Sequence, residues 1–364
     1  MKKLLAMLLC LCMVIAVVAC NTTGNENETT VDNGDQTTEA TYTLGMGVVV
    51  SFDSSKTGNA QVDATVATVV TDADGKIVAC RIDVAQNKFD LTADFAAQAA
   101  QTFKTKMEKG TEYGMAGKVD NDDNGVMLEW DAQTKAFEAY VVGKTAAEVE
   151  AIQTQEKKGH LIAVDQALLD AGCSMQITDF IAAVVKACND AQGMSFQAVK
   201  GTVTLGVAAK TTAEESVAAT AEANGTIKLY TDFAASAVVD GKIVASVNDA
   251  IQPNIIVDAA GEIVEKAFKD TKRNLKEEYA MAAAVNYGMD WNGDGKVLEW
   301  YLQSEAFSKY VVGKTATEVA DMATKVVEGA GYVISADDAL LTAGCTIQIT
   351  SIKAVVAQSV TNAR

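Results

Sequence analysis

The chain has 364 residues, of which 49% are hydrophobic, and its formal net charge is −18 at pH 7. This length allows two domains of ordinary size, each with enough apolar side chains for a core. The acidic balance argues against nucleic acid as a partner and against docking on anionic lipid, because both would repel the surface. With one histidine and no Cys-x-x-Cys spacing, the sequence also argues against zinc, haem and a cysteine–histidine nucleophile pair.

Residues 1–20 have the organisation of a bacterial export signal with a lipidation site. Lys2 and Lys3 precede an apolar run, and Val17-Val18-Ala19-Cys20 matches the lipoprotein box. The apolar run is short for a bilayer core of ~30 Å, and polar sequence follows the cysteine at once. We therefore expect a signal peptide over residues 1–20 and a lipid anchor on Cys20. This anchor would hold the protein on the outer face of the cytoplasmic membrane, in the extracellular space.

Residues 21–40 consist almost entirely of Asn, Thr, Gly, Glu and Asp. Such a segment cannot bury enough apolar surface to offset the entropy cost of ordering it. The sequence therefore predicts a disordered tether between the lipid and the folded part.

The rest of the chain contains one long block twice. Asp120 to Trp130 corresponds to Asp290 to Trp300, a distance of 170 positions (290 − 120), and the Tyr-Val-Val-Gly-Lys-Thr run ending at Thr145 recurs at the same offset. A match of this length predicts a tandem duplication. We expect repeat domain 1 over residues 41–192 and repeat domain 2 over residues 199–362.

Each repeat begins with sequence typical of antiparallel strands. Asp-Gly turns at Asp74 and Asp240 each indicate a hairpin. The expected strands cover residues 42–52, 61–71 and 76–84, and residues 202–207, 226–239 and 242–247. The next segment is ambiguous, because 91–103 has the composition of a helix whereas 254–268 is typical of a hairpin. Duplicated domains should share one structure here.

Helices follow the strands in each repeat. The first begins at Glu129 or Glu299, and the second at capping boxes, Thr145 with Glu148 and Thr315 with Glu318. The last has Thr178 or Thr350 as the expected N-cap. Its apolar face comprises Ile181, Val184 and Val185 in repeat 1, and Ile352, Val355 and Val356 in repeat 2. Strands followed by helices, then repeated, predict an α+β fold of two tandem domains, each an antiparallel sheet plus helices.

The Asp-rich part of the block follows the pattern of a calcium loop. Such a loop needs oxygen ligands at positions 1, 3, 5 and 12 and a glycine at position 6. The first loop supplies Asp120, Asp122, Asn124 and Asp131, and it resembles the dockerin type, which ends in Asp. The second supplies Asp290, Asn292 and Asp294 but has Tyr301 at position 12, so that its nearest acid is Glu299. A structural Ca²⁺ ion is one interpretation, and a turn that caps the following helix is the other.

Other reactive or aromatic side chains have simpler interpretations. Cys80, Cys173, Cys188 and Cys345 are expected to be small buried hydrophobic residues, and His160 to lie exposed in a loop. The recurring tyrosines and tryptophans, including Trp130 and Trp300, are expected in the core, with a stacking site for a flavin as the alternative. An enzyme would need a nucleophile beside a base, or a pair of carboxylates in a cleft. The sequence indicates neither arrangement.

The order of these motifs resembles repeated lipoproteins of Gram-positive anaerobes, which are related to the FMN-binding domains of extracellular electron-transfer lipoproteins. In flavin-carrying members, the threonine of a Ser-Gly-Ala-Thr type motif holds FMN through a phosphoester. The matching segments here, 171–178 and 343–350, lack the Gly-Ala-Thr core. Their hydroxyl side chains are the candidate FMN contacts: Ser174, Thr178, Thr346 and Thr350.

The resemblance implies a lipid-anchored binding or interaction module that lacks the covalent flavinylation motif and whose partner is a small ligand or a surface protein. One alternative is an extracellular electron carrier that holds FMN noncovalently or through an atypical acceptor. A further alternative is a solute-binding lipoprotein of a transporter.

Overall fold

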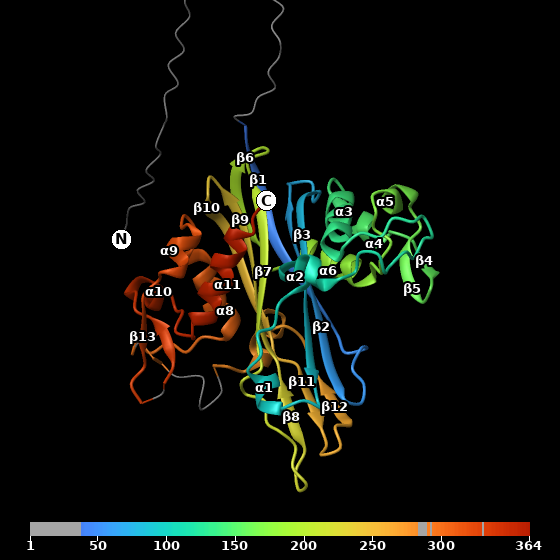
Figure 1. Cartoon of the computed structure of the whole chain (residues 1–364). Helices are drawn as coiled ribbons and strands as arrows, with labels where there is room; N and C mark the ends of the chain where they lie inside the picture. Colours follow the sequence, from blue (N-terminus) through green and yellow to red (C-terminus); the bar gives the residue numbers. More distant parts are fainter. Residues whose placement is uncertain (1–37, 283–289, 292, 330) are drawn as a thin grey trace, which may run out of the picture. The chain divides into compact units, whose positions relative to one another are not determined.

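Antiparallel strands form the centre of the protein, described here by a computed structural model that covers residues 38–282, 290–291, 293–329 and 331–364 (Figure 1). The first half of the chain forms a four-stranded sheet in the order β3-β2-β1-β6, and the second half a three-stranded sheet in the order β10-β9-β7. These strands are β1 (Glu39–Ser51), β2 (Asn59–Thr71), β3 (Ile77–Asp90), β6 (Met194–Val199), β7 (Thr204–Thr212), β9 (Tyr230–Val239) and β10 (Lys242–Ile251). Because β1 begins at Glu39, the last residues of the predicted tether belong to a strand. The predicted signal and Cys20 lie outside the described residues.

The Asp-Gly pairs form hairpin turns, as predicted. Val239 pairs with Lys242, so that Asp240 and Gly241 are a two-residue loop, and both have positive φ (50° and 73°). This conformation matches the right-handed twist of the flanking strands. The turn between β2 and β3 is longer, with Gly75 at a φ of 74°.

The segment after the first hairpin differs between the halves, against the prediction of a shared structure. In the first half, β3 continues to Asp90, and the predicted helix over 91–103 is reduced to α1 (Phe95–Ala99). In the second half, β10 ends at Ile251, two residues before Pro253. Proline has no amide proton for a sheet, so the strand cannot continue there.

The chain after Pro253 forms the predicted hairpin within a third sheet. Its strands are β8 (Gly225–Lys228), β11 (Asn254–Val257) and β12 (Ile263–Ala267), in the order β12-β11-β8. The predicted strand over 226–239 is therefore wrong as a single element. It breaks at Leu229, whose amide donates to the Pro253 carbonyl, into β8 and β9 of different sheets.

Two pairs of long helices recur in the two halves, and the first pair begins at the tryptophans Trp130 and Trp300. They are α3 (Trp130–Val141) and α8 (Trp300–Tyr310), and α6 (Thr178–Cys188) and α11 (Thr350–Thr361). The capping boxes at Thr145 and Thr315 are confirmed at the short helices α4 (Ala146–Glu150) and α9 (Ala316–Ala320). Thr178 and Thr350 are not N-caps, however. Each is the first helical residue, and the N-cap positions are held by Ile177 and Ile349, whose amides donate to hairpin carbonyls.

The buried face of α6 is shifted by one residue from the prediction. Phe180, Ala183 and Val184 are buried, whereas Ile181 and Val185 are only partly buried. In α11 the predicted residues Ile352, Val355 and Val356 are all buried. Thr350 follows Thr178 by 172 positions (350 − 178), so Phe180 rather than Ile181 corresponds to Ile352.

Glycine allows both helices to lie directly against a strand. A Cβ atom on Gly45 would stand 2.1 Å from the Ala187 carbonyl oxygen of α6, and one on Gly206 would stand 1.8 Å from the Ser359 carbonyl oxygen of α11. Any side chain would separate helix from sheet, so both positions require glycine.

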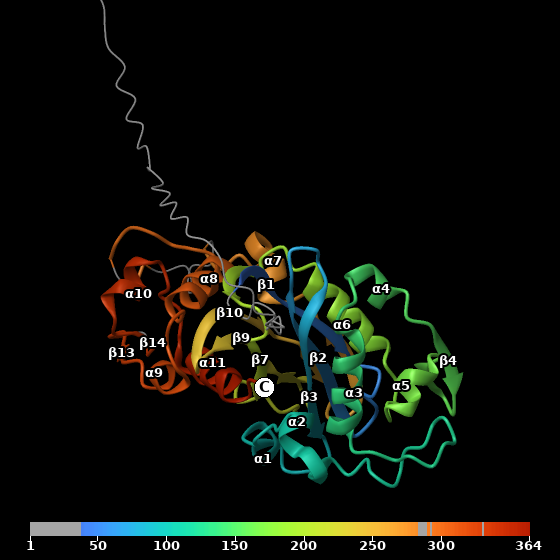
Figure 2. The same cartoon turned by 90° about the horizontal axis from the view of Figure 1, so that it is seen from above.

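Short elements complete the two helical groups, and Figure 2 shows the strands lying between these groups. They are α2 (Lys106–Lys109), η1 (Gly110–Tyr113), β4 (Thr154–Lys157), β5 (His160–Ala163), α5 (Gln166–Asp170), α7 (Lys272–Leu275), η2 (Lys276–Tyr279), β13 (Thr324–Val326), β14 (Val333–Ser335) and α10 (Asp338–Thr342). His160 is exposed as predicted, but it begins a strand of the β4–β5 hairpin rather than lying in a loop. In the described part of the chain, no helix is long and apolar enough to cross a membrane.

The sheets of the two halves share a hydrophobic core. Leu44 and Val66 of the first half cluster with Leu205, Phe233 and Val247 of the second, and the described residues from 38 onward belong to one compact unit. A buried ion pair adds to this contact: the Arg273 guanidinium lies 3.1 Å from the Asp190 carboxylate. The architecture is thus mixed α and β, with several small antiparallel sheets and helices.

Candidate ligand pocket

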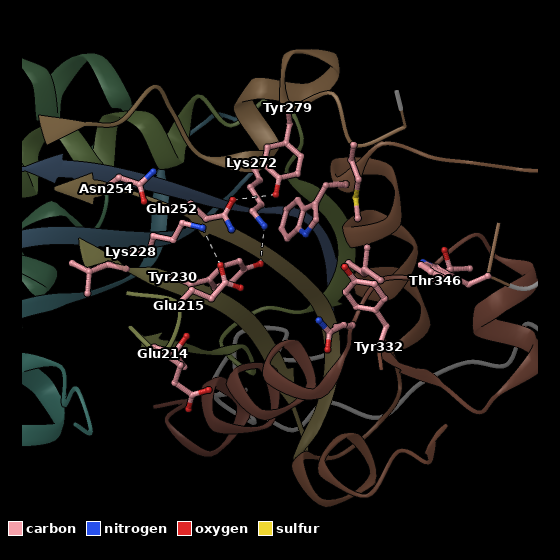
Figure 3. Close-up of a pocket in the computed structure, with 17 residues that line it drawn as sticks. Glu214, Glu215, Lys228, Tyr230, Gln252, Asn254, Lys272, Tyr279, Tyr332 and Thr346 are labelled. Atoms are coloured by element: carbon pink, nitrogen blue, oxygen red, sulfur yellow. Dashed lines mark hydrogen bonds and ion pairs between the residues drawn. The ribbon is translucent and has the colours of Figure 1, made fainter. Parts of the chain in front are cut away.

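A cavity of about 490 Å³ opens in the second half of the chain (Figure 3). This volume falls in the range of small-molecule sites. Polar side chains stand on one side of it, among them Glu214, Glu215, Gln252 and Asn254. Its other walls are rich in aromatic rings: Tyr230, Tyr279, Trp291, Trp300 and Tyr332.

The aromatic wall is held in place by polar contacts of the surrounding backbone. The Glu299 carboxylate, at the N-cap of α8, accepts from the amides of Met281 and Ala282 at 2.8 and 3.2 Å. It therefore fixes the chain after η2 beside Trp300, the first residue of α8. The Tyr279 hydroxyl donates to the Gln252 side chain at 3.1 Å, which joins η2 to the end of β10.

Lys272 is the central side chain of this wall, and it is only 4% exposed. Its ammonium donates to the Tyr230 hydroxyl at 2.8 Å and lies over three rings, 4.3 Å from the centroid of Tyr230, 4.7 Å from that of Tyr279 and 5.3 Å from that of Trp300. Such contacts stabilise a cation through the negative ring faces. Within the described residues, Lys272 has no ion pair. Burial therefore lowers the pKa of its ammonium, an effect that the neighbouring Asp232 carboxylate opposes.

Asp232 is a buried carboxyl group whose negative charge acts on the Lys272 ammonium. It is 3% exposed, and its Oδ1 atom has no hydrogen-bond partner. Burial raises the pKa of Asp232, and a hydrogen bond from Ser351 opposes the shift. The site thus combines an amine and a carboxyl group that are both held away from water, so that each is pushed toward its neutral form.

The first half has a related but different arrangement. Lys106 lies 5.0 Å from the ring centroid of Tyr113 and 5.4 Å from that of Trp130, but it is only half-buried. The strand register identifies the differences. Asp83 pairs with Val66, and Asp249 pairs with Phe233. Counting from these pairs, Asp63 stands where the second half has Tyr230, and Thr65 stands where it has Asp232.

Of the four predicted FMN contacts, Thr346 lines the cavity. Its amide and hydroxyl both donate to Oε1 of the buried Gln303, at 2.8 and 3.1 Å. Ser174 is buried, and its amide donates to Gln133, which corresponds to Gln303. The Ser174 hydroxyl has no hydrogen-bond partner within the described residues. Thr178 and Thr350 are the first residues of α6 and α11, and Thr350 is exposed.

The cavity residues fit an aromatic ring better than they fit a whole FMN molecule. The rings supply stacking surfaces for a planar ligand. A phosphate group would need an unpaired cation, but Lys228 pairs with Glu215 at 3.3 Å and Glu214 adds further negative charge. Among the described residues that line the cavity, Lys272 is the other basic side chain, and burial pushes it toward its neutral form. The site therefore does not fit a phosphate ester.

The first Asp-rich loop forms a network of its own hydrogen bonds. The Asp120 carboxylate accepts from the amides of Asn124 and Gly125, both at 3.1 Å, and Asp122 accepts from the Asn124 side chain at 2.7 Å. Asp131 lies in the first turn of α3, where it pairs with Lys135 at 2.7 Å.

The second loop repeats part of this network. Asp290 accepts from the amides of Asp294 and Gly295, at 2.9 and 2.6 Å, while Glu299 holds the amides after η2. Asn292 lies outside the described residues. Among those that are described, no three His, Cys, Asp or Glu side chains gather as a metal site would require. Calcium binding stays a prediction.

The four cysteines in the described part of the chain are free, and three of them are buried as predicted. Cys80, Cys173 and Cys345 lie in the core, whereas Cys188 is partly buried. Burial raises the pKa of Cys173 and of Cys345 to about 12, so these thiols remain protonated at neutral pH.

Sequence reasoning missed Lys272 and Asp232. One signal for the lysine was available: a Thr-Lys pair, Thr105-Lys106 and Thr271-Lys272, precedes the tyrosine in both repeats. Asp232 had no such signal, because the first repeat has no acid there. Comparison with known protein families, curated proteins and solved structures found no match to this chain.

Proposed function

We propose that the protein is an extracellular lipoprotein, anchored through Cys20, that binds a small planar aromatic ligand in the cavity of its second half. The observation that carries this proposal is the wall of five aromatic side chains around a volume of about 490 Å³. Apolar walls with a few polar groups that fix orientation are typical of small-molecule sites. A flavin ring, as in riboflavin, is of a size that such a cavity could hold. Polar side chains of the cavity could bind its carbonyl oxygens.

We also propose that the chain is two copies of one antiparallel-sheet-plus-helices module, of which the second is the binding copy. Support comes from the repeated block together with contacts that recur in both halves. Gln133 and Gln303 accept from the amides of Ser174 and Thr346, and Glu129 and Glu299 accept from amides after a short 3-10 helix. The residues around Lys106 and Lys272 have diverged, which favours different roles for the two copies.

Electron transfer by a bound flavin is the second candidate function. Lys272 favours it, because its protonated form would stabilise the negative charge of a reduced ring. A flavin supplies reversible electron uptake when it is bound.

Riboflavin titration tests ring binding directly. The fluorescence of riboflavin should be quenched on addition of the purified protein, and FMN should bind more weakly because of its phosphate. Tyr332→Ala removes a ring that lies 5.4 Å from Trp291 and should weaken binding about tenfold, since ring stacking contributes roughly 0.5–1.5 kcal/mol beyond area burial. Tyr113→Ala, in the first half, is the matched control and should bind normally. If riboflavin is not quenched, or if the two variants bind alike, the cavity is not the ring site.

A further inference from the structure

Lys272 has the surroundings of a nucleophilic amine rather than those of a structural cation. A buried lysine that serves stability is normally paired with a carboxylate, since an unpaired buried charge is costly. Within the described residues, the Lys272 ammonium has one hydrogen bond, to Tyr230, and no ion pair. Yet it stands on the wall of a cavity large enough for a small molecule. The wall thus presents a poorly hydrated amine to any ligand that enters.

We propose that Lys272 forms a reversible imine with the carbonyl carbon of an uncharged aromatic aldehyde or ketone bound in this cavity. This inference rests on the proposed function, because the ring of the carbonyl compound would occupy the aromatic wall. Figure 3 shows the Lys272 side chain lying between Tyr230 and Tyr279, with its nitrogen directed to the Tyr230 hydroxyl. Exposed Glu214 and Glu215, which also line the cavity, disfavour carboxylate-bearing carbonyl compounds.

The bond changes balance without any oxidant or reductant. The neutral amine of Lys272 attacks the carbonyl carbon, and its proton passes to the carbonyl oxygen to give a carbinolamine. The carbon–oxygen bond then breaks, the hydroxyl takes up the second amine proton and leaves as water, and a carbon–nitrogen double bond remains. One molecule of water is released for each imine, and hydrolysis reverses the reaction.

One neighbouring group can serve these proton transfers. The Tyr230 hydroxyl is within hydrogen-bond distance of the amine, at 2.8 Å, so it can relay the proton between nitrogen and oxygen. Burial and the neighbouring Asp232 raise the pKa of Tyr230, so the phenol keeps a proton to give.

The first half supplies a matched control for this chemistry. Lys106 also lies over a tyrosine and a tryptophan, but it is half-buried and has Asp63 in the place of Tyr230. At that position Asp63 offers no hydroxyl group to relay a proton between nitrogen and oxygen. Lys106 should therefore be unreactive although its local sequence is similar.

Reductive trapping tests the proposal on the full-length protein. The protein is incubated at pH 7 with 2-naphthaldehyde and sodium cyanoborohydride, which reduces imines to stable amines, and the adduct is located by intact mass and peptide mapping. The adduct at Lys272 should exceed that at Lys106 by at least about tenfold, since each unit by which a pKa falls raises the neutral amine fraction about tenfold. Lys272→Arg should abolish the main adduct, and Lys106→Arg should leave it unchanged. Labelling spread evenly over surface lysines, or unaffected by Lys272→Arg, would overturn the proposal.

Two further measurements separate this proposal from ring binding. Tyr230→Phe keeps the amine and should slow trapping at Lys272, which covers the case in which Lys272→Arg does not fold. 2-Naphthalenemethanol has the same ring without the carbonyl, and it should displace riboflavin without forming an adduct. Displacement by the alcohol with no adduct from the aldehyde would refute imine formation and leave ring binding intact. If neither compound displaces riboflavin or labels the protein, both proposals fail.

Discussion

Replacing Gln303 by leucine should destabilise the protein, because two buried polar backbone groups would lose their hydrogen-bond partner. Gln303 is 3% exposed; its Oε1 accepts from the Thr346 amide at 2.8 Å, and its Nε2 donates to the Leu298 carbonyl at 2.8 Å. Leucine fills a similar volume but leaves both groups buried without partners. Each unsatisfied group costs roughly 1–3 kcal/mol. We expect Gln303→Leu to lower the free energy of unfolding by about 3 kcal/mol, measured by urea denaturation.

The equivalent substitution in the first half separates stability from binding. Gln133→Leu leaves the Ser174 amide and the Leu128 carbonyl without their hydrogen-bond partner, so it should lower the free energy of unfolding by a similar amount. Only Gln303→Leu should also weaken riboflavin binding, because Thr346 lines the cavity. A Gln303→Leu variant within about 0.5 kcal/mol of the parent, the range of neutral surface substitutions, would refute the reasoning.

Three further predictions concern the helix–strand contact, a buried acid and calcium. Gly206→Ala places a Cβ atom 1.8 Å from a helix carbonyl oxygen and should lower stability by at least about 1–3 kcal/mol, seen as an earlier thermal transition; an unchanged transition would contradict the packing described. Burial raises the pKa of Asp83 to about 6 from 3.8, so the folded state binds this proton more tightly than the unfolded state. The contribution of Asp83 to the free energy of unfolding should be fully present below about pH 4. It should fall by about 3 kcal/mol as the pH rises through 6. In urea titrations across this range, Asp83→Asn should remove that slope, and an unaltered slope would exclude Asp83 as its source. Calcium should raise the melting temperature, and Asp131→Ala should remove the rise; no shift in the parent protein would favour a plain capping turn at this loop.

The local features of this chain are those that short stretches of sequence specify. A capping box needs only a threonine and a glutamate three residues apart, so Thr145 and Thr315 were identified correctly. The Asp-Gly turn at Asp240 is equally local, because its two residues provide the positive φ angles that the hairpin needs.

Longer-range features required the tertiary structure. Thr178 has a favourable N-cap side chain, yet the cap falls on Ile177, whose amide is tied to the carbonyl of Leu161. The strand predicted over 226–239 breaks because Leu229 pairs with Pro253. In both cases a contact with a segment remote in sequence outweighs the local preference.

The sequence by itself determined that a block is used twice, that a helix begins at Glu129 and Glu299, within one residue of the observed starts at Trp130 and Trp300, and that strands precede helices. Only the tertiary structure decided which half of the chain has the buried lysine and its cavity. The environment of Lys272 depends on the register of β9 against β10, which places Tyr230 and Asp232 near it, and on η2 and α8, which bring their rings from later in the chain. Burial and ring contacts are properties of this assembly, so no single stretch of sequence contains them.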